Sequence, residues 1–173
     1  VMPSYEAAAH LKTLCAKLEA VERGEIKNLM VTLPPRHGKS QTASINFPAW
    51  YLGQHPQDQI IGCSYAEGLA YEFSTAVRNT ITSAPYQKLW PHKLDTSGAI
   101  HWQLAGKENR RASYIAAGVG GGITGTGANL LIIDDPVKNE DEAASQSRKD
   151  VIWQWYITTA LTRMQPNVAK ILI

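Results

Sequence analysis

Short apolar runs alternate with helical stripes along most of this chain. Residues 28–33, 59–64 and 129–134 are nearly continuous apolar runs, which are typical of parallel strands buried on both faces. The intervening segments 41–52 and 67–83 are compatible with helices. Strands and helices in this order predict an α/β fold with a mainly parallel sheet, right-handed crossovers and helices on both faces.

The remaining segments predict an initial helix, a hairpin and a final helix. Ser4 can cap the initial helix, Gly24 can end it, and its apolar stripe passes through Leu14 or Cys15. Residues 85–97 carry few periodic signals, so they are predicted to be irregular. The other elements are predicted at 4–22 (helix), 99–104 and 113–117 (hairpin strands), 139–164 (helix with a capping-box start) and 170–173 (strand).

The first apolar run leads into the segment Leu33-Pro-Pro-Arg-His-Gly-Lys-Ser40. A triphosphate needs convergent N–H donors, a mobile cation and a hydroxyl for Mg²⁺, and Gly38, Lys39 and Ser40 supply these in P-loop order. The full pattern would begin with a glycine where Leu33 stands. The two prolines stiffen the loop and cannot donate, so the donors are expected from residues 36–40. An ordinary turn is the alternative, but the flanking strand and helix favour a phosphate loop.

A second motif, Asp134-Asp135-Pro136, closes the apolar run 129–134. Ligands of open α/β sheets collect at the carboxyl ends of the strands. Asp134 is therefore placed to hold Mg²⁺ through water with Ser40 as the partner oxygen, and Asp135 is the candidate to orient and deprotonate the attacking water. Asp and Pro also suit a plain strand-ending turn. Pairing with the phosphate loop favours the functional interpretation.

A glycine-rich segment precedes this strand. Residues 118–127 contain six glycines, which allow either a close backbone approach to a ligand or a merely flexible connection. Because the segment leads straight into the Asp134 strand, a moving or ligand-facing loop is the favoured interpretation.

Composition limits the possible functions. With 173 residues, 44% of them apolar, the chain fits one domain with one sizeable core. The net charge of +2 is too small to indicate nucleic-acid binding alone, and the basic residues 107–111 are interpreted as a solvated hairpin turn. Cys15 and Cys63 are predicted to be buried free thiols of a reducing compartment. Neither a membrane span nor a secretion signal is indicated.

Together these motifs resemble a known family, the ATPase domain of the large terminase subunit of tailed bacteriophages and prophages. The resemblance covers nearly the whole chain, and its most specific pieces are the segment 33–40, the run 121–136 and Ser64-Tyr65. Terminases commonly carry a deviant phosphate loop with an arginine inside it. Here Leu33 replaces the first glycine of the pattern, and Arg36 is the arginine inside the loop. The resemblance implies a RecA-like (ASCE) P-loop NTPase fold with an extra strand between the phosphate-loop strand and the Asp134 strand.

By motif position, the resemblance also implies roles for individual residues. Lys39 would contact the β- and γ-phosphates, Ser40 and Asp134 would serve Mg²⁺, and Asp135 would be the catalytic carboxylate. Arg36 is a candidate charge-neutralising finger. The family has an N-terminal adenine-binding segment, where His10 is the first residue to consider, although a plain helix-surface histidine is the favoured interpretation. The residues expected to contact ATP are Pro35, Arg36, His37, Gly38, Lys39, Ser40, Gln41 and His10.

The implied domain is a single ATPase domain at 1–173, a fragment of a longer protein, with 1–27 as a helical adenine-side segment and 28–173 as the P-loop core. Its implied activity is Mg-dependent ATP hydrolysis that moves double-stranded viral DNA into a procapsid in the host bacterial cytoplasm. The implied partners are double-stranded DNA, the portal protein, the small terminase subunit and further copies in a ring, with a monomer in isolation left open. The coupling motif and the nuclease domain would lie beyond residue 173, so DNA cleavage is not expected.

Three departures from the family pattern limit what can be carried over. Many terminases have Glu where this chain has Asp135, and related sequences often have a basic residue where Thr126 stands. Arg36 lies two residues before Gly38, which is not the spacing of some relatives. Two other functions stay open: a helicase-like or repair ATPase that acts on nucleic acid, and a nucleotide-binding assembly module with little turnover in isolation.

Overall fold

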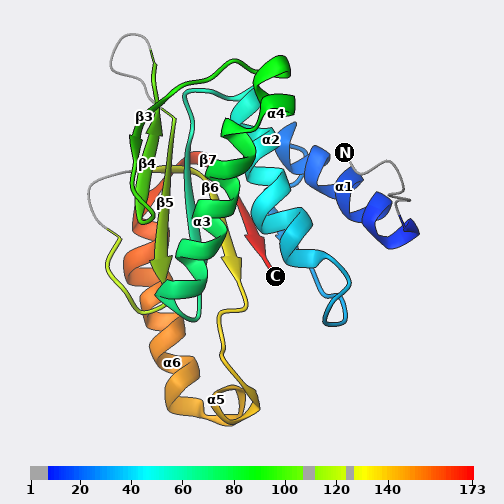
Figure 1. Ribbon diagram of the computed structural model, residues 1–173. Helices are drawn as coiled ribbons and strands as arrows, with labels where there is room; N and C mark the ends of the chain where they lie inside the picture. The colour runs from blue at the N-terminus through cyan, green and yellow to red at the C-terminus, as the bar shows by residue number, and fades with distance from the viewer. Residues whose placement is uncertain (1–7, 107–111, 124–126) are drawn as a thin grey trace.

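The computed structural model describes residues 8–106, 112–123 and 127–173, which form one open sheet with helices packed against it (Figure 1). The helices are α1 (Ala9–Glu22), the π-helix η1 (Gln41–Asn46), α2 (Phe47–Gln54), α3 (Glu67–Thr82), α4 (Ala84–Leu89), α5 (Glu140–Ala144), α6 (Gln146–Trp155), the π-helix η2 (Tyr156–Ala160) and the 3₁₀ turn η3 (Leu161–Arg163). The strands are β1 (Asn28–Met30), β2 (Gln59–Ser64), β3 (Leu94–Ser97), β4 (His101–Leu104), β5 (Ser113–Gly118), β6 (Ala128–Asp134) and β7 (Met164–Leu172). No helix in these ranges is long and apolar enough to cross a membrane.

The strand order of the sheet is β1-β7-β6-β2-β5-β4-β3. Neighbouring strands from β1 to β5 are parallel, whereas β4 and β3 extend the sheet as an antiparallel edge. β7 lies between β1, which leads into the phosphate loop, and β6, which ends in Asp134. This is the extra strand that the terminase resemblance implies. Ser64 at the end of β2 is in register with Asp134, so the carboxyl ends of these two strands are level.

Each face of the sheet has its own core, because consecutive strand residues point to opposite sides. Ile60 packs on the face covered by α1, η1, α2 and α3, where Phe47 and Val77 are buried. Its neighbour Ile61 packs on the other face against Trp155 at the end of α6. Figure 1 shows α2 and α3 on one side of the strands and α6 on the other. The predicted mainly parallel α/β fold with helices on both faces is confirmed.

The prediction that residues 85–97 are irregular is wrong. They contribute most of α4 and the whole edge strand β3. Ser83 has an extended backbone before α4, and Pro85 lies in the first turn, where a missing N–H is tolerated. β3 has no buried side chain, so its strand conformation depends on the ladder with β4 and not on an apolar pattern.

The predicted last helix is interrupted and ends early. Its start is confirmed, because the Asn139 side chain accepts a hydrogen bond from the Glu142 N–H at 3.0 Å. The chain is then extended at Ser145, whose hydroxyl accepts from the Arg148 N–H and so begins α6 as a second helix. From Met164 the chain pairs with β6 as part of β7, so the helix cannot reach that residue as predicted.

One of the two cysteines is not buried as predicted. The apolar stripe of α1 runs through Leu14, Leu18 and Val21, and this leaves Cys15 exposed. Cys63 in β2 is buried, and burial raises the pKa of its thiol to about 12. The predicted helix cap at Ser4 and the basic turn at 107–111 lie outside the described residues.

Replacing Gly62 with alanine is expected to destabilise the protein by about 1–3 kcal/mol, through overpacking. A Cβ at Gly62 would lie 2.0 Å from the Tyr114 hydroxyl oxygen and 2.6 Å from Cζ. The Tyr114 ring is itself buried and stacked on Trp102 at 5.5 Å, so it has little room to move. Urea unfolding measures the change. The matched control is Gly68→Ala in α3, where no atom lies within 4 Å of the added Cβ. That variant should unfold at the wild-type urea concentration or above it, and equal losses in both variants would contradict the packing argument.

Candidate nucleotide-binding site

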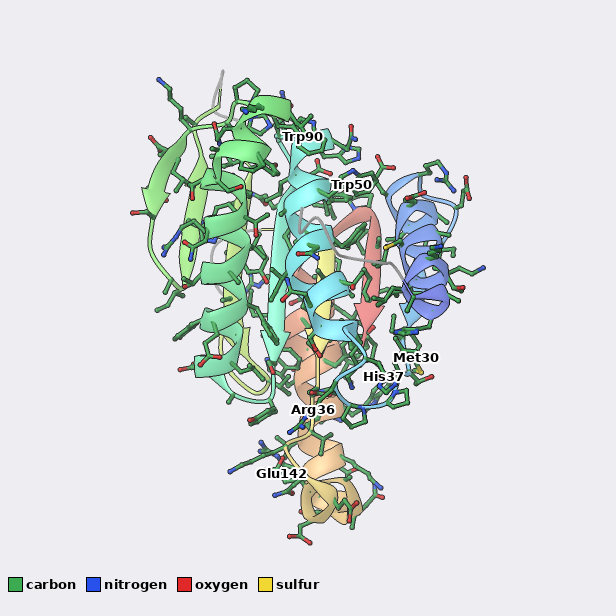
Figure 2. The ribbon with its side chains drawn as sticks, turned by 45° about the vertical axis from the view of Figure 1, so that its right-hand side comes forward. Met30, Arg36, His37, Trp50, Trp90 and Glu142 are labelled. Atoms are coloured by element: carbon green, nitrogen blue, oxygen red, sulfur yellow. The ribbon has the colours of Figure 1, made fainter. Side chains whose placement is uncertain are left out.

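The phosphate loop lies at the carboxyl end of the parallel strands. Figure 2 shows Arg36 and His37 near the lower ends of the strands, with Trp50 and Trp90 toward the opposite end. Arg36 has φ +63° and Gly38 has φ +79°, so two left-handed residues reverse the chain between β1 and η1. A positive φ is uncommon for a residue other than glycine, and such residues cluster at functional sites. The first helical bond after the turn runs from the Thr42 N–H to the Gly38 carbonyl at 2.9 Å.

Helix α1 packs directly on this loop. A Cβ added at Gly38 would lie 3.3 Å from Leu11 Cδ2, so glycine permits both the turn and the close approach of the helix. His10 Nε2 donates to the His37 carbonyl at 3.2 Å, and the two rings meet edge to face at 5.6 Å. His37 Nδ1 in turn donates to the Pro35 carbonyl at 2.9 Å. His10 is therefore a contact of the loop through its ring nitrogen.

Lys39 faces the second motif across the site. Its Nζ lies 3.5 Å from Asp135 Oδ1, and the two side chains are 22% and 50% exposed. The Asp135 backbone is left-handed, with φ +47°. It is held on both sides, because its N–H donates to the Ile173 carbonyl and its own carbonyl accepts from the Tyr65 N–H at 3.0 Å. These two bonds hold the Asp135 main chain in place, and its carboxylate lies toward Lys39 of the phosphate loop.

Asp134 occupies a more buried position than Asp135. It is 1% exposed, and Ser44 Oγ donates to its Oδ2 at 2.5 Å. Burial raises the pKa of the Asp134 carboxyl, and the hydroxyls of Ser44 and Ser40 oppose that rise. The charge of Asp135 raises the pKa further, whereas Lys39 lowers it. Asp134 Oδ1 has no hydrogen-bond partner among the described residues.

These groups fit a nucleoside triphosphate and its cation. A buried carboxylate oxygen without a partner, close to the Ser40 hydroxyl, suits a hard divalent cation, which prefers oxygen ligands. Lys39 and the loop N–H groups suit phosphate oxygens. The structure thus brings together Lys39, Ser40, Asp134 and Asp135, as the sequence predicts.

Two further predicted contacts, Gln41 and Pro35, make hydrogen bonds within the protein. Gln41 Nε2 donates to Asn46 Oδ1 at 3.0 Å, so its amide is engaged within η1. Pro35 takes part through its carbonyl, which accepts from His37. Residues 124–126 of the glycine-rich segment, which includes Thr126, lie outside the described residues.

Sequence reasoning missed one residue that contacts the site. Ser44 was not among the predicted residues, yet its side chain holds Asp134. The signal was present in the sequence, because Ser44 follows Ser40 by four positions and residues so spaced share one face of a helix.

A cavity of about 420 Å³ adjoins the loop between α1 and the η1–α2 segment. Leu11 lines it and is also the residue that touches Gly38. The lining is mostly apolar with polar groups at intervals, and comprises Leu11, Lys12, Cys15, Leu18, Glu19, Thr42, Asn46, Phe47 and Trp50. A planar, mainly apolar group attached to a triphosphate has space there.

Comparisons with known proteins identify the family and the fold of the chain. The family model described as "Terminase large subunit, T4likevirus-type, N-terminal" matches residues 30–167. No curated protein matches the chain significantly. Among solved structures, the large terminase of bacteriophage HK97 is 16% identical with a TM-score of 0.59, over 100% of this chain and 34% of that one.

Two further structures have the same fold. A point mutant of the large terminase ATPase domain of Thermus phage P74-26 is 15% identical with a TM-score of 0.61, over 90% of this chain and 62% of that one. The large terminase of bacteriophage D6E is 11% identical with a TM-score of 0.55, over 90% of this chain and 37% of that one. The chain thus spans about a third of the two whole terminases. The expectation of a terminase ATPase domain is confirmed in family and fold, and the chain belongs to the family of N-terminal domains of the phage terminase large subunit.

Proposed function

We propose that this domain hydrolyses Mg-ATP and that the hydrolysis powers the translocation of double-stranded viral DNA into a procapsid. The observation that carries the proposal is the convergence of Lys39 and Ser40 with Asp134 and Asp135 at one end of the sheet, where Lys39 Nζ is 3.5 Å from Asp135 Oδ1. This set matches the parts that phosphoryl transfer needs: a phosphate-binding lysine, cation ligands and a base. Membership in the terminase family supports DNA packaging as the purpose of the hydrolysis.

In the proposed mechanism, the loop from Pro35 to Gln41 binds the triphosphate. The N–H groups at the start of η1 donate to phosphate oxygens, and Lys39 exchanges its contact with Asp135 for the β- and γ-phosphates. Ser40 and Asp134 would hold Mg²⁺, which when bound would neutralise charge on the phosphates and withdraw electrons from the scissile bond. Asp134 would take part through Oδ1, which has no hydrogen-bond partner among the described residues.

Asp135 and Arg36 are proposed to act on the reacting groups. Asp135 is half exposed, so its carboxylate can orient a water and accept its proton once Lys39 has moved to the phosphates. Its side chain is shorter than the Glu of many terminases, and the fixed left-handed backbone directs it toward the loop. Arg36 lies in the same loop and supplies positive charge near the transferring phosphoryl group.

The adenine side is proposed to lie along α1. In this division, residues 1–27 form the adenine-side segment and 28–173 the P-loop core of a single domain at 1–173. The cavity lined by Leu11, Phe47 and Trp50 adjoins the loop and can accept the base. His10 contributes through its bond to the His37 carbonyl, which couples α1 to the phosphate loop.

The partners belong to the same proposal, because the chain spans only a third of the whole terminases that it matches. They are double-stranded DNA, the portal protein, the small terminase subunit and further copies of the chain in a ring on the procapsid. The reaction would take place in the host bacterial cytoplasm. A helicase-like or repair ATPase gains no support from the family match.

One observation favours a second function for the isolated chain, that of a nucleotide-binding module with little turnover. The proposed base Asp135 is paired with Lys39 at 3.5 Å, so the two groups neutralise each other until a triphosphate separates them. An isolated chain that keeps this pairing after it binds ATP would hydrolyse the nucleotide very slowly. Calorimetry with ATP, beside a turnover assay of the isolated chain, separates the two: tight binding with very slow turnover favours the module.

The proposed function is tested by phosphate release from ATP by the full-length protein, with Mg²⁺ and with EDTA. Turnover is expected only with Mg²⁺, since Asp134 and Ser40 act through the cation. In the same assay, Arg36→Ala should cost about 10³-fold in rate if the arginine stabilises the transferring phosphoryl group. A wild-type protein that neither binds nor hydrolyses ATP would overturn the proposal, and an Arg36→Ala rate near wild type would remove the arginine from it.

A further inference from the structure

A buried hydrogen bond ties the phosphate-loop helix to the carboxylate of the second motif. Ser44 lies in η1, is 1% exposed, and donates through Oγ to Asp134 Oδ2 at 2.5 Å. A bond from a hydroxyl to an ionised carboxylate is among the stronger hydrogen bonds in proteins. Ser44 has no role in the proposed reaction, yet its hydroxyl is hydrogen-bonded to Asp134, a proposed cation-binding residue.

The local backbone explains why Ser44 faces the strand. η1 is π-helical, and its last bond runs from the Phe47 N–H to the Thr42 carbonyl, five residues back. Pro48 follows; it has no N–H to give, and its ring would clash with the carbonyl four residues earlier, which is that of Ser44. The widened turn relieves this conflict, and π-helical segments occur frequently at functional sites. It also keeps Ser44 on the side of the helix that faces the end of β6, where its hydroxyl donates to Asp134.

The two carboxylate oxygens of Asp134 differ in their hydrogen bonding. Oδ2 is engaged by Ser44, whereas Oδ1 is buried with no hydrogen-bond partner within the described ranges. Next to it in the register, Ser64 on β2 is fully buried and its hydroxyl also has no partner in those ranges. A buried carboxylate oxygen is costly to leave unpaired. The unpaired state of Oδ1 is explained if this oxygen binds a ligand, whereas the hydrogen bond to Oδ2 holds the side chain in place.

We propose that Ser44 is a positioning residue, which fixes the Asp134 carboxylate by one oxygen so that the other remains available to the cation that accompanies the nucleotide. This inference rests on the proposed function, since it concerns the same cation. Without the Ser44 hydroxyl, the carboxylate can rotate and Oδ1 is no longer held. Partners that orient a metal ligand from behind commonly contribute a factor of about 10 to 100 in metal affinity.

The test is calorimetric binding of ADP to the full-length protein, once with Mg²⁺ and once with EDTA. The ratio of the two dissociation constants gives the contribution of the cation. Ser44→Ala should reduce this ratio by about 10-fold to 100-fold and leave the dissociation constant in EDTA unchanged, because the phosphate-loop donors and Lys39 are intact. Ser44→Thr keeps the hydroxyl and should keep a ratio near wild type. If Ser44 had only a structural role, Ser44→Ala would change the dissociation constants for ADP in Mg²⁺ and in EDTA by the same factor.

Ser74→Ala in α3 is the matched control. Ser74 is also fully buried, and its Oγ accepts from Trp102 Nε1 at 3.0 Å, so the variant loses a buried serine hydrogen bond on α3 instead of at the end of β6. Its Mg²⁺ ratio should equal that of the wild type. An unchanged ratio in Ser44→Ala, or an equal fall in Ser74→Ala, would overturn the proposal.

Two further outcomes are distinguishable. If Ser44→Ala fails to fold, Ser44→Cys decides, because the slightly larger thiol leaves no cavity and is only a weak donor: a reduced Mg²⁺ ratio supports the proposal and a wild-type ratio overturns it. If the wild-type protein binds ADP with no Mg²⁺ contribution at all, the proposed cation site itself fails, and the positioning role fails with it.

Discussion

Replacing Lys39 with alanine is expected to reduce ATP hydrolysis by about 10²–10³-fold at saturating Mg-ATP, the usual cost of removing one preorganised charge from a transition state. Lys39 is only 22% exposed and already points across the site to Asp135. Phosphate release by the full-length protein measures the effect.

The same variant should leave the fold almost unchanged. A partly exposed pair at 3.5 Å such as Lys39–Asp135 contributes about 1 kcal/mol or less to stability, so urea unfolding should be near wild type. Lys88→Ala is the matched control, because Lys88 lies in the last turn of α4, away from the loop. It should retain full hydrolysis. Normal turnover in Lys39→Ala would rule out the assignment of the phosphate loop.

The buried strands were predictable because their chemistry is local. β2 covers the predicted 59–64, and β6 covers the predicted 129–134 with one residue added, since near-continuous apolar runs specify burial on both faces. The edge strand β3 could not be found in this way. Its side chains are exposed or half-buried, and its pairing with β4 joins segments that no periodic signal connects. For the same reason, the sequence pattern did not show that β7 begins at Met164, beside Ala128.

The part of the site that follows from the order of the motifs along the chain could be predicted from the sequence. Lys39 and Asp135 meet because both follow strands of one parallel sheet, whose carboxyl ends share an edge. The contacts of His10 and Ser44 depend on packing between elements. The apolar pattern of the first helix did not indicate that the His10 side chain faces the phosphate loop. For Ser44, the spacing from Ser40 carried the signal, but the π-helical turn and the depth of Asp134 appear only in three dimensions.

Replacing Asp135 with asparagine should reduce ATP turnover by about 10²–10⁴-fold and leave nucleotide binding intact. An amide cannot accept a proton from the attacking water, but it preserves the size of the side chain. The backbone also suits the change, because φ +47° is left-handed and asparagine adopts that conformation readily. The protein should therefore fold as the wild type does, and the rate loss can be attributed to chemistry.

The two measurements for this variant are phosphate release and the dissociation constant for ATP with Mg²⁺. Removing a negative charge 3.5 Å from Lys39 frees that lysine for the phosphates, so ATP binding should be equal to the wild type or tighter. Asp135→Glu keeps a carboxylate at the position and should retain far more turnover than the amide. If Asp135→Asn hydrolyses ATP at the wild-type rate, Asp135 is not the base, because no step would then depend on its charge.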